Sequence, residues 1–198
     1  ITSFCAPPTI YRMLIIADLK KFSFSELRTC TSAGEPLNPE VIRIWKEGTG
    51  LTIREGYGQT ETCCCIATMP GMEVKQGSMG KPVPGWHIQL HDDDGNEVPQ
   101  GDTGRIAISL NPRPAGLIRE YLDNPEENAA MFVNGWYYTG DKAYLDEDGY
   151  FWFVGRNDDV IKSSGYRISP FEVESTLLEH PAVKESAVVG SPDAIRGM

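Results

Sequence analysis

The opening part of the chain alternates between strand-like runs and helical patterns. Pro7 and Pro8 precede a helical stretch at residues 9–17, the first element we expect, because proline is favoured at a helix start. β-Favouring runs predict buried strands at residues 27–32 and 51–57.

Between these two strands, the capping residues and the apolar pattern predict a helix. Asn38 can cap its start, Pro39 suits its first position, and Gly48 is expected to close it. Its apolar face consists of Val41, Ile42 and Trp45. The order strand, helix, strand predicts a βαβ unit.

From Gly77 onward, short strands replace this pattern. Asp94-Gly95 and Asp148-Gly149 are hairpin signals, and one helix is expected at residues 125–131. These signals predict a small antiparallel sheet or barrel. Its expected strands are residues 87–91, 97–98, 104–110, 137–145 and 150–154.

The tail has too few elements to complete a domain. A hairpin is expected within residues 160–168, and Ser169 with Glu172 forms a capping box for a helix at residues 169–179. Residues 183–190 predict a final strand.

Composition and charge exclude several function classes. The 198 residues are 40% hydrophobic and 23% charged, with 18 Lys and Arg against 28 Asp and Glu, a net charge of −10. This acidity argues against a nucleic-acid partner, because phosphate binding relies on Lys and Arg. No apolar run approaches the ~20 residues of a membrane helix, and no secretory signal opens the chain.

Five cysteines, three of them adjacent at residues 63–65, suit no disulfide framework. Zinc is a less favoured alternative, because zinc sites use spaced ligands. A strand of small residues is the better interpretation. Residues 77–81 resemble a phosphate-binding loop but lack its first glycine, since Lys75 stands there.

Polar motifs follow both early strands. Ligands bind at the carboxyl ends of strands in open α/β sheets, so residues 31–36 and 55–61 are candidate sites. A purine can stack on Tyr57, the Thr60 hydroxyl can donate to a phosphate, and the Glu61 carboxylate suits Mg²⁺. A structural turn with a core tyrosine is the alternative that the residues alone leave open.

Two further motifs have nucleotide chemistry. Asp141, in Tyr138-Thr139-Gly140-Asp141, can accept both hydroxyls of a ribose, and Arg156 can donate to the same sugar or to a phosphate. Taken singly, an aspartate in such a motif more often belongs to a structural turn, and such an arginine more often lies on the surface.

Together, these motifs resemble the adenylate-forming superfamily, and most closely its medium-chain acyl-CoA synthetases. The subfamily resemblance rests on residues 146–156 and 163–168. The superfamily resemblance rests on six blocks in the family's order: residues 6–12, 32–37, 57–61, 77–82, 138–141 and 155–162.

The resemblance implies an α/β fold followed by a small antiparallel β subdomain. Residues 1–157 would be the C-terminal part of the family's large domain, with an α/β segment at 1–76 and a β-rich part at 77–157. Residues 158–198 would begin its small α+β C-terminal domain. Because the chain starts at Ile1 and ends at Met198, we expect a fragment.

The family chemistry has two halves. A carboxylate attacks the α-phosphate of ATP to give acyl-AMP and pyrophosphate, and the thiol of coenzyme A then displaces AMP after the small domain rotates. The resemblance therefore implies a carboxylic acid, ATP and CoA as substrates, with Mg²⁺ as cofactor. It implies a cytoplasmic location, or the mitochondrial matrix in a eukaryote. The identity of the acid and the oligomeric state stay open.

Residue roles carry over motif by motif. Adenine would be bordered by Gly34, Glu35 and Pro36, and the nucleotide wrapped by Glu55, Gly56, Tyr57, Gly58, Gln59 and Thr60. Thr60 and Glu61 would be catalytic, with Glu61 holding Mg²⁺, and Asp141 and Arg156 would bind the ribose. Asp158 matches a hinge. Ser164, Gly165, Tyr166, Arg167 and Arg196 match the region that meets CoA or phosphates.

The family's phosphate loop normally lies before residue 1 and its C-terminal lysine after residue 198, so we expect the isolated chain to be inactive. Two alternatives remain for the parent protein. One is a luciferase-like or peptide-synthetase-type relative that adenylates without CoA, and the other is a non-catalytic nucleotide-binding module.

Overall fold

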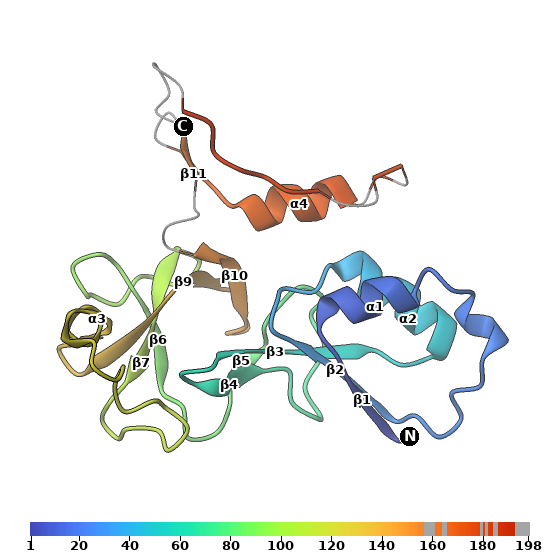
Figure 1. The fold of residues 1–198 in the computed structure, drawn as a ribbon, viewed down its shortest axis with the longest axis horizontal. Helices are drawn as coiled ribbons and strands as arrows, with labels where there is room; N and C mark the ends of the chain where they lie inside the picture. The colour runs from blue at the N-terminus through green and yellow to red at the C-terminus, as the bar shows by residue number, and fades with distance from the viewer. Residues whose placement is uncertain (157–160, 164–165, 179, 181, 184–185, 193–198) are drawn as a thin grey trace. The chain divides into compact units, whose positions relative to one another are not determined.

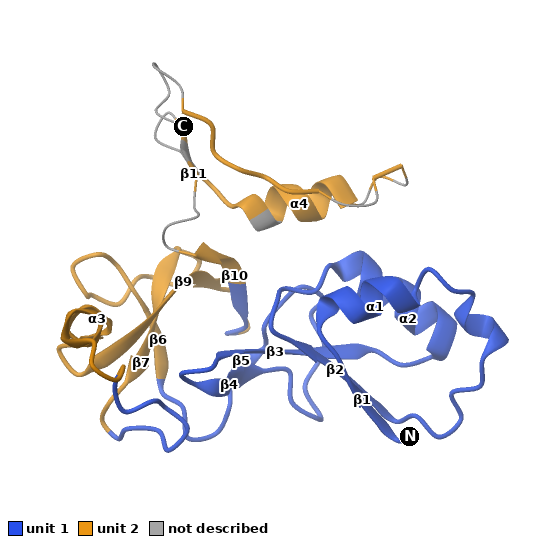
Figure 2. Ribbon diagram, viewed as in Figure 1, with its two compact units in different colours: residues 1–87, 112–120, 149–152 blue, residues 88–111, 121–148, 153–198 orange. Residues whose placement is uncertain are grey.

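The computed structural model describes residues 1–156, 161–163, 166–178, 180, 182–183 and 186–192. It divides into two compact units, shown in different colours in Figure 2. The first unit comprises residues 1–87, 112–120 and 149–152, and the second comprises residues 88–111, 121–148 and 153–198. The expected domain boundary at residue 157 falls outside the described residues and stays a prediction.

A five-stranded mixed sheet forms the first unit (Figure 1). The first three strands are parallel to one another, and the last two join antiparallel. In sheet order, the strands are β1 (Ser3–Cys5), β2 (Thr29–Ala33), β3 (Ile53–Gln59), β4 (Cys63–Ala67) and β5 (Lys81–Pro82). The predicted βαβ unit and the cysteine-rich strand are therefore confirmed.

The helices of this unit begin at their predicted start signals, but both end elsewhere than expected: the first, predicted to reach residue 17, ends at Leu14. Helix α1 (Pro8–Leu14) begins after Pro7, and a 3-10 turn, η1 (Leu19–Lys21), follows it. Helix α2 (Pro39–Thr49) begins where the Asn38 side chain accepts the Glu40 N–H at 2.8 Å. The expected end at Gly48 is wrong. The helix continues to Thr49 and ends at Gly50, which adopts a left-handed φ of 79°.

Aromatic residues join the helices to the sheet. Tyr11 of α1 is fully buried and packs edge-to-face on Trp45 of α2, with ring centroids 4.9 Å apart. Phe4 of β1 stacks on the same indole at 6.0 Å. This cluster fixes α1 and α2 against β1 and β2, because aromatic pairs add directional energy to area burial.

The second unit contains an antiparallel sheet. Strands β6 (Ile88–His91), β7 (Gly104–Ser109) and β9 (Trp136–Leu145) pair antiparallel, and β10 (Phe151–Arg156) lies beside β9. A short strand, β8 (Phe132–Val133), also pairs with β9. These strands confirm the predicted small antiparallel sheet.

Helix α3 (Pro125–Met131) has the bounds that its sequence predicts, and the Asn124 side chain accepts the Glu127 N–H at its start. The strand expected at residues 97–98 is wrong: Glu97 forms only an isolated bridge with His91.

The tail has a hairpin and a helix. Strands β11 (Ile161–Ser163) and β12 (Tyr166–Ile168) pair antiparallel, and Ser169 Oγ accepts the Glu172 N–H at the start of α4 (Pro170–Leu178). The strand predicted at residues 183–190 is not formed in its described part. There, the Val188 N–H donates to the Glu174 carboxylate at 2.8 Å instead of to a neighbouring strand. Among the helices in the described part of the chain, none has the length and apolar character needed to cross a membrane.

Candidate nucleotide site

The carboxyl ends of β2 and β3 bring the two early polar motifs together. The strands are parallel, with Ser32 opposite Glu55 and Ala33 opposite Gly56. The chain therefore leaves both strands at the same edge of the sheet. This edge, formed by residues 33–37 and 56–61, is called the strand-end edge below. Ligands bind at such edges in α/β folds.

The turn after β2 requires glycine for its backbone. Gly34 has a φ of 103°, while an added Cβ would meet no atom within 4 Å. Glu35 follows with a half-exposed carboxylate, which accepts from Arg12 Nη2 at 3.4 Å. The turn thus places a solvent-facing polar side chain next to Pro36 without crowding the surface around it.

Glu55 contributes its side chain to the interior. Its carboxylate accepts the Leu37 N–H at 2.9 Å and also bonds to the backbone of Gly77. Burial raises the pKa of Glu55 to about 7, although both backbone donors act in the opposite direction. The carboxylate therefore contacts the two neighbouring loops.

The turn after β3 is held close to β4. A Cβ on Gly58 would lie 1.6 Å from the Cys63 carbonyl oxygen, so no side chain fits there. Gln59 N–H donates to Thr62 Oγ1 at 2.9 Å, and Thr62 N–H donates back to the Gln59 carbonyl at 3.1 Å. This closed turn leaves Thr60 exposed at its tip, where its hydroxyl can meet a ligand.

A loop that the sequence reasoning missed supports Glu61. The Ile118 N–H donates to the Glu61 carbonyl at 2.7 Å. A Cβ on Gly116 would lie 3.7 Å from the Thr62 carbonyl oxygen and 3.1 Å from the Trp86 ring, so this loop packs against both the turn and Trp86. The sequence feature that could have indicated this loop is the Pro- and Gly-rich run at residues 112–116, because such runs are typical of constrained loops.

Asp141 lies in a bulge of the second unit. Arg105 pairs with Lys142 and Ala107 with Tyr138, so residues 139–141 of β9 stand opposite the single residue Ile106. Thr139 Oγ1 accepts the Asp141 N–H at 3.2 Å, and the Asp141 side chain is buried. Bulges re-aim side chains and recur beside active sites.

The remaining predicted residues belong to the second unit or lie outside the described residues. Arg156 ends β10 and is exposed, and the backbones of Tyr166 and Arg167 form part of β12. The structure does not describe Asp158, Ser164, Gly165 or Arg196.

A metal ion at this site would have few protein ligands. Within the described ranges, no three His, Cys, Asp or Glu residues are grouped to hold a metal ion. Mg²⁺ commonly binds one or two carboxylates together with phosphates and water, so Glu61 fits that ion in a nucleotide complex. Burial raises the pKa of the Cys65 thiol to about 12, which disfavours the thiolate that zinc needs.

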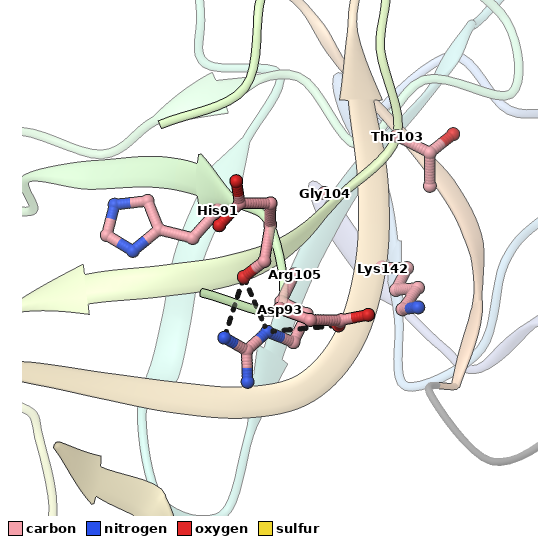
Figure 3. Close-up of a pocket in the computed structure, with 7 residues that line it drawn as sticks. His91, Asp93, Thr103, Gly104, Arg105 and Lys142 are labelled. Carbon is pink, nitrogen blue, oxygen red and sulfur yellow. Dashed lines mark hydrogen bonds and ion pairs between the residues drawn. The ribbon is translucent and has the colours of Figure 1, made fainter. Parts of the chain in front are cut away.

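A separate small cavity of about 80 Å³ lies in the second unit (Figure 3). Arg105 donates to the Asp92 carbonyl at 2.7 Å, and its guanidinium lies over the Tyr138 ring. His91 contacts the Tyr138 hydroxyl at 3.1 Å. The cavity is too small for a nucleotide, and several of the polar groups around it bond to one another.

Comparison with known proteins decides the family. A family model described as AMP-binding enzyme matches residues 1–122, which is more than half of the chain. The chain belongs to the AMP-binding enzyme family. The model of this family's C-terminal domain matches residues 172–198.

Two curated relatives of this chain are named as a CoA ligase and an acyl-coenzyme A synthetase. The chain is 59% identical to 4-hydroxybutyrate–CoA ligase 1 of Metallosphaera sedula, over 99% of the chain and 35% of that protein. It is 56% identical to the mitochondrial acyl-coenzyme A synthetase ACSM3 of Rattus norvegicus, over the whole chain and 34% of that protein. The chain thus spans about a third of the length of these curated relatives.

A solved structure agrees with the fold of this chain. The anthranilate CoA ligase AuaEII, in complex with anthranoyl-AMP, superimposes with a TM-score of 0.90 at 41% identity. The match covers 98% of the chain and 37% of AuaEII. The predicted fold class, α/β followed by a small antiparallel sheet, is therefore confirmed.

Proposed function

We propose that the whole protein is an AMP-forming acyl-CoA synthetase of the medium-chain type. The observation that carries the proposal is the strand-end edge. It combines an open glycine turn after β2 with a closed turn after β3 that presents Thr60, in a chain of the AMP-binding enzyme family. The relatives named above are CoA ligases, which favours CoA as the acyl acceptor.

The reaction has two balanced steps. An oxygen of the acid's carboxylate forms a bond to the α-phosphorus of ATP, and the bond to the β-phosphate breaks to release pyrophosphate. The CoA sulfur then loses its proton to solvent and bonds to the acyl carbon, while the carbon–oxygen bond to AMP breaks. Phosphoryl transfer of this kind depends mainly on positioning and on charge neutralisation.

Within the first unit, adenine would lie against Gly34, Glu35 and Pro36, with the Tyr57 ring available for stacking. The Thr60 hydroxyl would donate to the α-phosphate or to the acid's carboxylate. Glu61 would hold Mg²⁺, which neutralises phosphate charge when bound.

In the second unit, Asp141 would accept the ribose hydroxyls and Arg156 would donate to the same sugar. Asp158 would act as the hinge between the two half-reactions. The CoA region would include Ser164, Gly165, Tyr166, Arg167 and Arg196. We place the protein in the cytoplasm, or in the mitochondrial matrix if its source is eukaryotic; the rat relative is named as mitochondrial.

Isotope exchange between pyrophosphate and ATP, together with AMP release, tests the proposal on the whole protein. We expect exchange to require an acid and AMP release to require CoA as well. Exchange without CoA-dependent AMP release would favour a luciferase-like or peptide-synthetase-type relative. Nucleotide binding without exchange would favour a non-catalytic module. A panel of butyrate, octanoate, a branched acid and benzoate would identify the acid.

A further inference from the structure

The middle of β3, the central strand of the first unit's sheet in Figure 1, carries a partly buried carboxyl group, that of Glu55. Glu55 pairs in register with Ser32 of β2, so both side chains lie on the same face of the sheet. Ser32 is 2% exposed, and its hydroxyl has no hydrogen-bond partner among the described residues. The neighbour of Glu55 on β2 is therefore a neutral polar residue.

The bonds of Glu55 reach two loops that are distant in sequence. Its side chain accepts the Leu37 N–H, one residue beyond Pro36, and bonds to the backbone of Gly77. Its own carbonyl accepts the Thr68 N–H at 2.9 Å, after the end of β4. One residue thus connects the turn after β2 with the chain on the other side of β3.

No charged side chain is among the causes that shift the pKa of this carboxyl group: desolvation raises it, and the two backbone donors lower it. The charged groups of neighbouring segments have other contacts. Glu35 pairs with Arg12, Glu40 pairs with Arg43, Arg54 donates to the Met69 carbonyl, and Lys75 and Lys81 lie over the Tyr150 ring. Nearby thiols of Cys30, Cys64 and Cys65 have raised pKa values and stay neutral near pH 7.

We propose that Glu55 is a positioning residue: its ionised carboxylate ties the Gly34–Pro36 turn and the Gly77 loop to β3, and loss of its charge weakens nucleotide binding. The inference rests on the proposed function for its nucleotide part. Hydrogen bonds to an ionised acceptor are stronger than bonds to a neutral one. A proton on Glu55 therefore loosens Leu37, and with it the turn that borders the adenine.

Two variants separate the charge from the hydrogen bond. Glu55→Gln keeps an acceptor oxygen but cannot ionise, whereas Glu55→Ala leaves the Leu37 N–H without its acceptor. Glu47→Gln is the matched control, because it removes the same charge from an exposed position on α2. All three are compared with wild type in the whole protein.

The first readout is amide hydrogen exchange at Leu37, measured at the same pH for each protein. We expect exchange at least tenfold faster in Glu55→Ala, and no change in Glu47→Gln. Unchanged exchange at Leu37 in Glu55→Ala would overturn the anchoring role, whether or not the protein binds nucleotide.

The second readout is the Kd for AMP by calorimetry. The ratio of the Glu55→Gln value to the wild-type value cancels the titration of AMP itself. We expect a ratio near one at pH 6, and at least fivefold weaker binding by the variant at pH 8. A ratio that does not change with pH would overturn the inference while leaving the proposed function intact. If wild type does not bind AMP at all, the proposed function fails, and the nucleotide part of this inference fails with it.

Discussion

The partly buried charge of Glu55 has a cost in stability that can be measured. Its pKa of about 7 lies about 2.5 above the ordinary value of 4.5. At about 1.4 kcal/mol per pH unit, this corresponds to about 3 kcal/mol. Between these two pKa values, the folded protein holds a proton that the unfolded chain releases. The contribution of Glu55 to the free energy of unfolding is therefore fully present below pH 4.5 and is lost as the pH rises through 7.

Glu55→Gln removes this dependence, because the amide does not titrate. We expect the variant and wild type to differ little near pH 5, and the variant to gain up to about 3 kcal/mol relative to wild type by pH 8. The gain would accompany weaker nucleotide binding, a common trade between stability and function.

Urea unfolding followed by circular dichroism at pH 5, 6, 7 and 8 gives the free energies of unfolding. Glu47→Gln, at an exposed position, is the control for removing one negative charge. Parallel pH curves for wild type and Glu55→Gln, with a constant offset, would refute the idea that Glu55 is buried with a raised pKa.

Three other changes test separate parts of the site. Gly58→Ala should lower the Tm and abolish AMP binding, because its Cβ would lie 1.6 Å from the Cys63 carbonyl oxygen; normal binding would show that the turn can open. Asp141→Ala should lower kcat/KM for ATP at least tenfold, about 1.4 kcal/mol, and wild-type steady-state kinetics would contradict a ribose contact. Ile118→Pro removes the N–H that donates to Glu61, so it should reduce adenylation well below the level of Ile118→Ala, which keeps that donor. Equal activities of these two variants would exclude a supporting role for the loop.

Local signals predicted the elements that depend on neighbouring residues. Asn38 and Pro39 fix the start of α2 through one side-chain hydrogen bond, and the sequence shows both residues side by side. Asp94-Gly95 forms a tight turn in which Gly95 adopts a φ of 87°. Because such preferences need no distant partner, they can be read from a few consecutive residues.

Some elements that depend on distant pairing were missed or wrongly predicted. Residues 3–5 become a strand only because they lie beside β2, and their sequence is too short to show a period. The run at residues 183–190 has a strand-like composition, but the Val188 N–H meets a carboxylate of α4 instead of a neighbouring strand.

The sequence motifs named candidate site residues, whose ligand roles stay predictions, but they did not indicate the contacts of those residues. The motifs located Glu55 and Asp141, but two facts depend on strand register and burial. The Glu55 carboxylate accepts the Leu37 N–H inside the protein, and Asp141 stands in a bulge opposite Ile106. Sequence spacing does not contain this information, because it comes from the pairing of β2 with β3 and of β7 with β9.

A single-turnover experiment tests the central claim most directly. The whole protein, in excess over ATP labelled in its α-phosphate, is mixed with an accepted acid and quenched at intervals, with CoA then added to half of the samples. The account predicts that labelled acyl-AMP accumulates without CoA and converts to AMP with one equivalent of acyl-CoA when CoA is present. Label that stays in ATP for every acid in the panel, or passes directly to AMP without an acyl-AMP intermediate, would contradict it.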